Sequence, residues 1–204
     1  MTRRFQSTAL IVSPIALWCL IWLAMQVAHG QTPAFDESIR RAIHDAANPG
    51  LTRVLEAVTL LGSQAVVISV ASCAVLILFF QGRRDRALLI AIAMAGAELL
   101  LWILKVEFHR PRPEPFFGSV PPASYSFPSG HALLSFCCYG TLSAVCSPRR
   151  WVRIAAAALI LSVGISRVYL GVHYPSDVIA GYLVAILWMA SVAVAYRRLA
   201  SVDR

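Results

Sequence analysis

The stretch SRVYLGVHYPSD, residues 166–177, separates two long apolar runs and decides how the chain must fold. It carries a guanidinium at Arg167, an imidazole at His173 and a carboxylate at Asp177. Such groups are costly inside or beside a lipid bilayer and are usually retained for a function. A carboxylate four residues after a histidine is placed to orient the imidazole and to stabilise its cationic form. The stretch therefore predicts a poised histidine beside an anion-binding arginine.

Pro175 refines this geometry. Proline suits the first turn of a helix, so we expect His173 just before the last helix and Asp177 within its first turns. The contact between the two side chains then depends on how the loop enters that helix.

The composition is that of an integral membrane protein. Of the 204 residues, 58% are hydrophobic and only 14% are charged, whereas soluble domains have about 45–50% apolar and about 25% charged residues. The formal net charge is +8. Because the arginines lie in short turns between apolar runs, this excess indicates membrane topology and not nucleic-acid binding.

Six apolar segments each approach the ~20 residues that a membrane-spanning helix needs. We therefore predict a single all-α integral-membrane domain over residues 1–204, a six-transmembrane helix bundle. The spans are expected at roughly residues 9–28, 54–80, 87–104, 129–146, 152–170 and 176–196.

The arginines predict the orientation of the bundle. Eleven of the 18 basic residues fall on one side, namely Arg3, Arg4, Arg83, Arg84, Arg86, Arg149, Arg150, Arg153, Arg197, Arg198 and Arg204. The positive-inside rule makes this side cytoplasmic, so we expect both termini in the cytoplasm and a multi-pass protein of the plasma (inner) membrane. In an alternative, the first segment is a signal peptide cleaved near Ala28. We favour an uncleaved helix, and cleavage would leave five helices in the same orientation.

Two of the outward-facing segments have a distinct character. Residues 30–53 are polar but place Phe35, Ile39, Ala42 and Ile43 at helical spacing, which predicts a short interfacial helix on the outer face. The loop at residues 107–128 is rich in proline and aromatic residues. It is either a rigid turn with aromatic anchors at the membrane interface or the rim of a substrate entrance.

Two further polar clusters reach the same outer face as residues 166–177. One contains Lys105 and Arg112, and the other is Pro128-Ser129-Gly130-His131 at the start of the fourth span. The first N–H groups of a helix bind anions, and a glycine lets an oxyanion approach the backbone. With Arg167, the cations suffice to hold a tetrahedral phosphate. No metal-ligand spacing is visible, so we expect these cations to replace Mg²⁺ as charge neutralisers.

The two histidines of this pocket suggest a division of labour. His173, oriented by Asp177, is the better nucleophile, and His131, at a helix N-terminus, is the better general acid. Arg110 is a competing phosphate ligand, although the spacing favours Arg112. Glu98 is a costly acid within the third span, which either hydrogen-bonds to another helix or lies along a polar path to the site.

At these residues the chain resembles the membrane branch of the type 2 phosphatidic acid phosphatase superfamily, the lipid phosphate phosphatases. The three-part signature of that family is matched by Lys105-x6-Arg112-Pro113, Pro128-Ser129-Gly130-His131 and Ser166-Arg167-x5-His173-x3-Asp177. The resemblance implies a phosphohistidine on His173, with Asp177 as its partner and His131 as the general acid. It also implies a metal-free and cofactor-free phosphate pocket made by Lys105, Arg112, Ser129, Gly130 and Arg167. The region before Lys105 carries no part of the signature.

We therefore expect an integral-membrane phosphatase that hydrolyses a lipid phosphate or diphosphate at the outer membrane face. The family suggests phosphatidic acid, phosphatidylglycerophosphate and undecaprenyl diphosphate as substrates, and the sequence does not separate them. One alternative is a lipid phosphotransferase that uses the same intermediate. Another is a lipid-phosphate transporter without turnover. The soluble haloperoxidases that share the pocket signature are disfavoured by the hydropathy.

Overall fold

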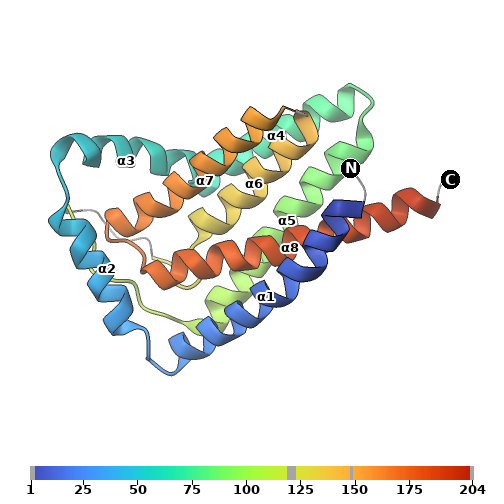
Figure 1. The fold of residues 1–204 in the computed structure, drawn as a ribbon. Coiled ribbons are helices and arrows are strands. Elements are labelled where there is room, and N and C mark those ends of the chain that lie inside the picture. The colour runs from blue at the N-terminus through green and yellow to red at the C-terminus, as the bar shows by residue number, and fades with distance from the viewer. Residues whose placement is uncertain (1–2, 119–122, 148, 203–204) are drawn as a thin grey trace.

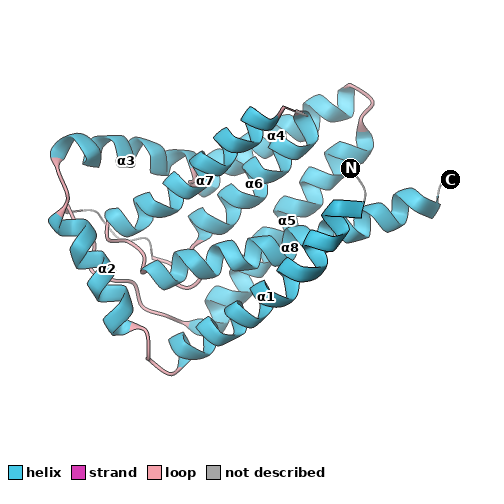
Figure 2. Ribbon diagram, viewed as in Figure 1, coloured by secondary structure: helices cyan, strands magenta, loops and turns pink. Residues whose placement is uncertain are grey.

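The chain forms a helical bundle in this computed structural model, which describes the backbone of residues 3–118, 123–147 and 149–202 and the side chains of residues 12–118, 123–147 and 149–196. All regular structure in the described part is helical, so the all-α prediction is confirmed (Figure 2). The helices are α1 (Arg3–Ala28), α2 (Pro33–Asp45), α3 (Pro49–Leu61), α4 (Gln64–Phe80), α5 (Arg84–Phe108), α6 (Gly130–Cys146), α7 (Arg150–Tyr169) and α8 (Pro175–Val202).

Helix α6 lies at the centre and packs against α4, α5, α7 and α8, while α1 packs along α8 and α3 packs along α7 (Figure 1). The main core joins fully buried residues of four helices, among them Val67, Ile90, Leu133 and Ala185. A smaller cluster seats Leu23 of α1 against Ala180 of α8. The apolar runs of the sequence thus form the interior and the lipid-facing flanks of one bundle.

The bundle has two chemically different ends. Helices α5 and α7 finish, and α6 and α8 begin, at the same end, which we call the loop end (Figure 1). The short α4–α5 and α6–α7 connections form the opposite end, which we call the arginine end. It holds Arg83, Arg84, Arg86, Arg149, Arg150 and Arg153. Helix α1 starts and α8 finishes there (Figure 1). The expected grouping of arginines is therefore observed along the described chain, whereas Arg204 lies outside it.

Within the described residues, three helices, α5, α7 and α8, are long and apolar enough to cross a membrane alone. The second predicted segment is not one straight helix, because α3 and α4 meet at an angle of 46°. Ser63 caps α4 by accepting a hydrogen bond from the Val66 N–H. Gly62, at the bend, lies so close to α7 that a Cβ atom there would be 2.2 Å from Val163 Cγ1. Counting bent pairs as single spans raises the number to five, and α6 is a shorter apolar helix; the six-span layout stays a prediction.

Helix α2 crosses the loop end at 95° to α1 (Figure 1). Its expected apolar face is only half right. Ile39 and Ile43 pack against the bundle, but Phe35 is 47% exposed and Ala42 is also exposed. The buried positions of α2 are instead Asp36 and Arg40. Asp36 pairs with Arg110, whereas Arg40 pairs with Glu37 of the same helix and donates to the Glu114 carbonyl. The placement of α2 at a membrane interface stays a prediction.

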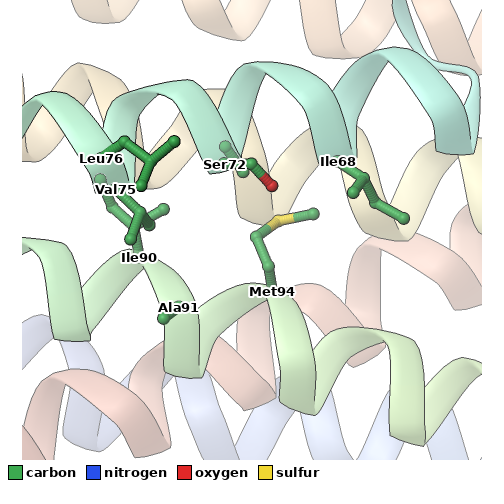
Figure 3. A pocket seen from close by; sticks show the side chains of 8 residues that line it. Ile68, Ser72, Val75, Leu76, Ile90, Ala91 and Met94 are labelled. Atoms are coloured by element: carbon green, nitrogen blue, oxygen red, sulfur yellow. The ribbon is translucent and has the colours of Figure 1, made fainter.

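An apolar groove runs between α4 and α5 (Figure 3). Met94 of α5 points toward Ser72 of α4 across it, and Ile68, Val75 and Ile90 line its length. None of the predicted site residues lines this groove. The groove is therefore separate from the polar clusters of the sequence.

Candidate active site

All three polar clusters of the sequence meet at the loop end. Lys105 lies in the last turn of α5, Ser129 to His131 open α6, Arg167 lies in the last turn of α7, and Asp177 lies in the first turn of α8. The Ser129 N–H donates to the carbonyl oxygen of Asp177 at 2.9 Å, which fixes the start of α6 to the start of α8. Gly181 permits this approach, since a Cβ atom there would lie 2.7 Å from the Ser129 carbonyl oxygen.

His173 and Asp177 form the buried pair that the sequence predicts. His173 precedes α8 and is 1% exposed, and Asp177 is fully buried. The His173 Nδ1 atom lies 3.3 Å from Asp177 Oδ2. The same oxygen accepts the Tyr174 N–H at 2.9 Å and the Ser126 hydroxyl. The carboxylate is thereby held with one oxygen toward the imidazole.

Arg112 fixes the other side of the imidazole. Its Nη1 lies 3.0 Å from His173 Nε2 and also donates to the Val172 carbonyl at 2.9 Å. The Ser124 carbonyl accepts from Arg112 Nε at 2.7 Å. A guanidinium only donates, so Nε2 must present its lone pair and Nδ1 must carry the proton that faces Asp177. The contacts thus define the tautomer of His173.

Burial determines the charge of this histidine. It lowers the pKa of His173 to about 4, against the hydrogen bond and the charge of Asp177, which raise it. Burial also lowers the pKa of Arg112, an effect that the charge of Asp177 opposes. His173 is consequently neutral near pH 7, with the Nε2 lone pair directed toward Arg112.

Two buried donors near this pair have no hydrogen-bond partner among the described residues. They are the Ser129 hydroxyl and Arg167 Nε. Ser129 is fully buried and Arg167 is 7% exposed, and Arg167 Nη1 donates to the Thr59 hydroxyl at 2.7 Å. Buried polar groups are rarely left unsatisfied. Both residues are predicted phosphate ligands, and an oxyanion would satisfy them.

The remaining predicted residues lie around the same point. Lys105 donates to the carbonyl oxygen of Tyr125, which draws its amine toward the 109–127 loop. Gly130 packs against Leu101, whose Cδ2 would be 3.0 Å from an added Cβ. His131, the second residue of α6, interacts electrostatically with Lys105, Arg112, Arg167 and His173. The structure therefore brings all eight predicted site residues to one end of the bundle, and their roles in catalysis stay predictions.

Arg110 contacts a different set of side chains from Arg112. It forms ion pairs with Asp177 Oδ1 at 2.6 Å and with Asp36 Oδ2 of α2 at 2.7 Å. The guanidinium is thus held between two carboxylates on the far side of Asp177 from the imidazole. The interpretation of Arg110 as a competing phosphate ligand is not supported, because buried acids engage both of its terminal nitrogens.

Asp36 and Ser126, which contact Arg110 and Asp177 respectively, were not among the site residues predicted from the sequence. Asp36 had a detectable signal, since it shares a helical face with Ile39 and Ile43 at i+3 and i+7, where an acid is unexpected. Ser126 had none, because a serine in an irregular loop is common.

Glu98 forms a contact between helices. Its Oε2 accepts from Gln64 Nε2 of α4 at 2.9 Å, while Oε1 is buried without a partner among the described residues. Of the two interpretations of Glu98, a hydrogen bond to another helix is therefore observed.

The loop after α5 is tied to the site at several points. The Ser126 N–H donates to the Arg110 carbonyl at 2.9 Å, and the Phe116 N–H donates to the Leu170 carbonyl at 3.1 Å. Phe116 also stacks on His44 with ring centroids 4.1 Å apart. Residues 119–122 lie outside the described part. A rigid turn and a substrate rim both remain compatible with these contacts.

Known proteins share this architecture. Residues 86–200 match the sequence model of the PAP2 superfamily. The chain is 29% identical over 183 residues to phosphatidylglycerophosphatase B of Bacillus subtilis, covering 85% of this chain and 90% of that protein. It is 32% identical over 124 residues to an undecaprenyl-diphosphatase of Sulfolobus acidocaldarius, covering 58% and 59%. Its fold is similar to the crystal structure of a transmembrane PAP2-type phosphatidylglycerolphosphate phosphatase from Bacillus subtilis, with a TM-score of 0.78, 27% identity and coverage of 91% and 96%.

Proposed function

Because this chain belongs to the PAP2 superfamily, we propose that it is a membrane phosphatase that hydrolyses a lipid phosphate or lipid diphosphate through a phosphohistidine on His173. The chain is a membrane-embedded, multi-pass protein, as its apolar helices and membrane relatives indicate. Its relatives include a phosphatidylglycerophosphatase and an undecaprenyl-diphosphatase, which supports phosphate release as the reaction class.

The observation that carries the proposal is the arrangement around the two nitrogens of His173. Nδ1 faces the Asp177 carboxylate at 3.3 Å and Nε2 faces the Arg112 guanidinium at 3.0 Å. A neutral imidazole with its Nε2 lone pair beside a cation is arranged to attack the phosphorus of an anion that the cation holds. Asp177 stabilises the positive charge that develops on the ring during the attack.

The surrounding donors suit the charge of a phosphoryl group in transfer. Arg112, Arg167 and Lys105 supply positive charge, and Ser129 adds a buried hydroxyl. The first N–H groups of α6, at Gly130 and His131, add the dipole of a helix start. Among the described residues, no group of three His, Cys, Asp or Glu side chains is arranged to hold a metal ion. We therefore propose that these cations neutralise the transferred phosphoryl group.

The proposed reaction has two steps. In the first, His173 Nε2 forms a bond to phosphorus, the bond from phosphorus to the lipid oxygen breaks, and His131 gives its proton to the leaving oxygen. In the second, His131 takes a proton from water, the water oxygen attacks phosphorus, and the bond between phosphorus and His173 breaks. Inorganic phosphate leaves, and both histidines return to their starting protonation.

The proposed setting is the outer face of the plasma (inner) membrane, with six spans and both termini in the cytoplasm. The support is the position of the arginine end opposite the loop end and the positive-inside rule. Substrates with the phosphate at the bilayer edge, such as phosphatidic acid, phosphatidylglycerophosphate or undecaprenyl diphosphate, would reach the loop end from the membrane.

The decisive experiment is phosphate release by the purified protein from a panel of these three lipids in detergent, with and without EDTA. We expect turnover of at least one lipid, and none by His173→Ala. Phosphate release by His173→Ala at the wild-type rate would refute the assignment of His173 as the nucleophile. No phosphate release by the wild-type protein from any of the lipids would favour a transporter. In ¹⁸O-labelled water, hydrolysis puts the label into free phosphate, whereas a phosphotransferase would deliver unlabelled phosphate to a lipid acceptor.

A further inference from the structure

We propose that Asp36, acting through Arg110, holds the Asp177 carboxylate in the orientation that serves His173, which makes helix α2 a required part of the active site. The inference rests on the proposed function for its kinetic consequences. Asp36 and all of α2 lie outside residues 86–200, which carry the family match. A connection between this helix and the site is therefore a property of the assembled structure.

Arg110 forms a bridge between two buried acids. Its Nη1 donates to Asp177 Oδ1 at 2.6 Å and its Nη2 donates to Asp36 Oδ2 at 2.7 Å. Nη2 also donates to the Thr32 hydroxyl at 3.0 Å. Both carboxylates are 0% exposed, so water does not replace these contacts. A chain of direct contacts thus runs from Asp36 through Arg110 and Asp177 to His173.

Asp36 also accepts a hydrogen bond from the backbone beside Asp177. The Ser176 N–H donates to Asp36 Oδ1 at 2.9 Å, and the Ser176 hydroxyl donates to Asp36 Oδ2 at 2.7 Å. The same hydroxyl oxygen accepts from Arg110 Nη1 at 2.8 Å. Asp36 therefore fixes the first turn of α8 through the main chain as well as through Arg110.

The two oxygens of Asp177 are assigned by these contacts. Arg110 occupies Oδ1, so that Oδ2 is left for His173, Tyr174 N–H and Ser126. Without Arg110 the carboxylate keeps its Oδ2 contacts to Tyr174 N–H and Ser126 but loses the donor that fixes Oδ1, and its charge is no longer balanced inside the protein. Orientation of the carboxylate and the strength of its interaction with the imidazole both depend on Arg110.

The loss of Arg110 has a predictable electrostatic sign. His173 interacts with Asp177 of α8, Arg112 of the 109–127 loop, Arg167 of α7 and His131 of α6. Removing the Arg110 charge leaves Asp177 as a stronger attractor of a proton on His173, because a nearby uncompensated anion favours the cationic imidazole. A substitution that only weakened the fold would not be expected to raise the pKa of His173.

The test uses the full-length protein in detergent with Asp36→Asn, Arg110→Gln, Arg110→Lys and the Asp36→Asn/Arg110→Gln double variant. The matched controls are Asp45→Asn and Arg41→Gln, exposed residues of the same helix. The first readout is the pKa of His173 from ¹⁵N-histidine NMR, with the resonance assigned through His173→Ala. It does not depend on turnover. The second readout is kcat and KM on the lipid that the panel identifies.

We expect Arg110→Gln to raise the pKa of His173 by about one unit or more and Arg110→Lys to leave it near the wild-type value. Arg110→Gln and Asp36→Asn should each lower kcat by about 10²-fold with little change in KM, because the reacting geometry loosens. The double variant should lose less than the product of the two single losses, since both substitutions act in part through the same carboxylate.

An unmoved His173 titration in Arg110→Gln would overturn the inference, and so would additive losses in the double variant or activities equal to those of the controls. If the wild-type protein releases no phosphate but Arg110→Gln still raises the pKa of His173, the proposed function is refuted and the positioning role is supported.

Discussion

The substitution Asp177→Asn tests the site most directly, because it keeps the shape of the side chain and removes its charge. The wild-type carboxylate accepts from Arg110 at Oδ1 and from Tyr174 N–H, Ser126 and His173 at Oδ2. An asparagine has one acceptor oxygen, so one set of donors must face its NH₂ group. Either Arg110 loses its partner, or the His173 side does.

Both arrangements damage the site. If the oxygen turns to Arg110, the NH₂ group faces His173 Nδ1, which must then accept, and the ring proton moves to Nε2. That tautomer presents no lone pair to phosphorus. If the oxygen stays with His173, the tautomer survives but the charge that stabilises the imidazolium is lost. We expect kcat to fall by about 10³–10⁴-fold, which corresponds to about 4–5.5 kcal/mol at ~1.4 kcal/mol per tenfold.

The same change lowers stability. Breaking a buried ion pair by removing one partner costs about 3–5 kcal/mol, so the assay is run well below the unfolding temperature of the variant, measured in the same detergent. The substrate is a lipid phosphate from the panel, and Asp45→Asn is the control for a neutralised aspartate at an exposed site. A folded Asp177→Asn protein with kcat within about threefold of the wild type would refute the assigned tautomer and the role of the carboxylate.

Four further outcomes are expected. Since burial lowers the pKa of His173 to about 4, the neutral nucleophile persists as pH falls through 6.5, and on the acid side of the profile kcat/KM should decline only toward pH 4; a midpoint near 6.5 for this acid-side decline would contradict the lowered pKa of His173. The same shift makes the folded state less stable between about pH 6.5 and 4 as pH falls, because the unfolded chain binds the proton first, which thermal unfolding at several pH values would show. His131→Ala should cost about 10²–10⁴-fold with a lipid ester but far less with an activated aryl phosphate, and equal losses on both would exclude an acid role. Phosphate release should persist after treatment with EDTA, and inhibition that Mg²⁺ reverses would contradict charge neutralisation by Arg112, Arg167 and Lys105.

Much of this architecture was accessible from the sequence because membrane helices are long and apolar and because arginines mark the turns. The three polar clusters were expected on one face, and Lys105, Ser129, Arg167 and His173 do meet at the loop end. The hydropathy pattern did not predict the break between α3 and α4, because the composition does not change there. The bend at Gly62 lies inside an apolar segment, and Gly62 packs closely against Val163, a contact that no local pattern reveals.

The charged network behind the site was also beyond the sequence. Arg110 and Arg112 are both arginines followed by proline, and only the three-dimensional positions of Asp36 and Asp177 separate their roles. The position of Asp36 on the same helical face as Ile39 and Ile43 signals burial, but nothing in the local pattern identifies its partners. Long-range ion pairs of this kind leave no periodic trace in a single chain.

The long sequence separation between Asp36 and its partners has a consequence for the assembly of the protein. Its partner Ser176 lies 140 positions later in the chain, so most of the protein must be synthesised before this acid finds its donors. Until the last helix is inserted, neither Asp36 nor Arg110 has its full set of contacts. Assembly of the site is then one of the last events of biogenesis, and nascent or C-terminally truncated chains are expected to be inactive even when their earlier helices are correctly in the membrane.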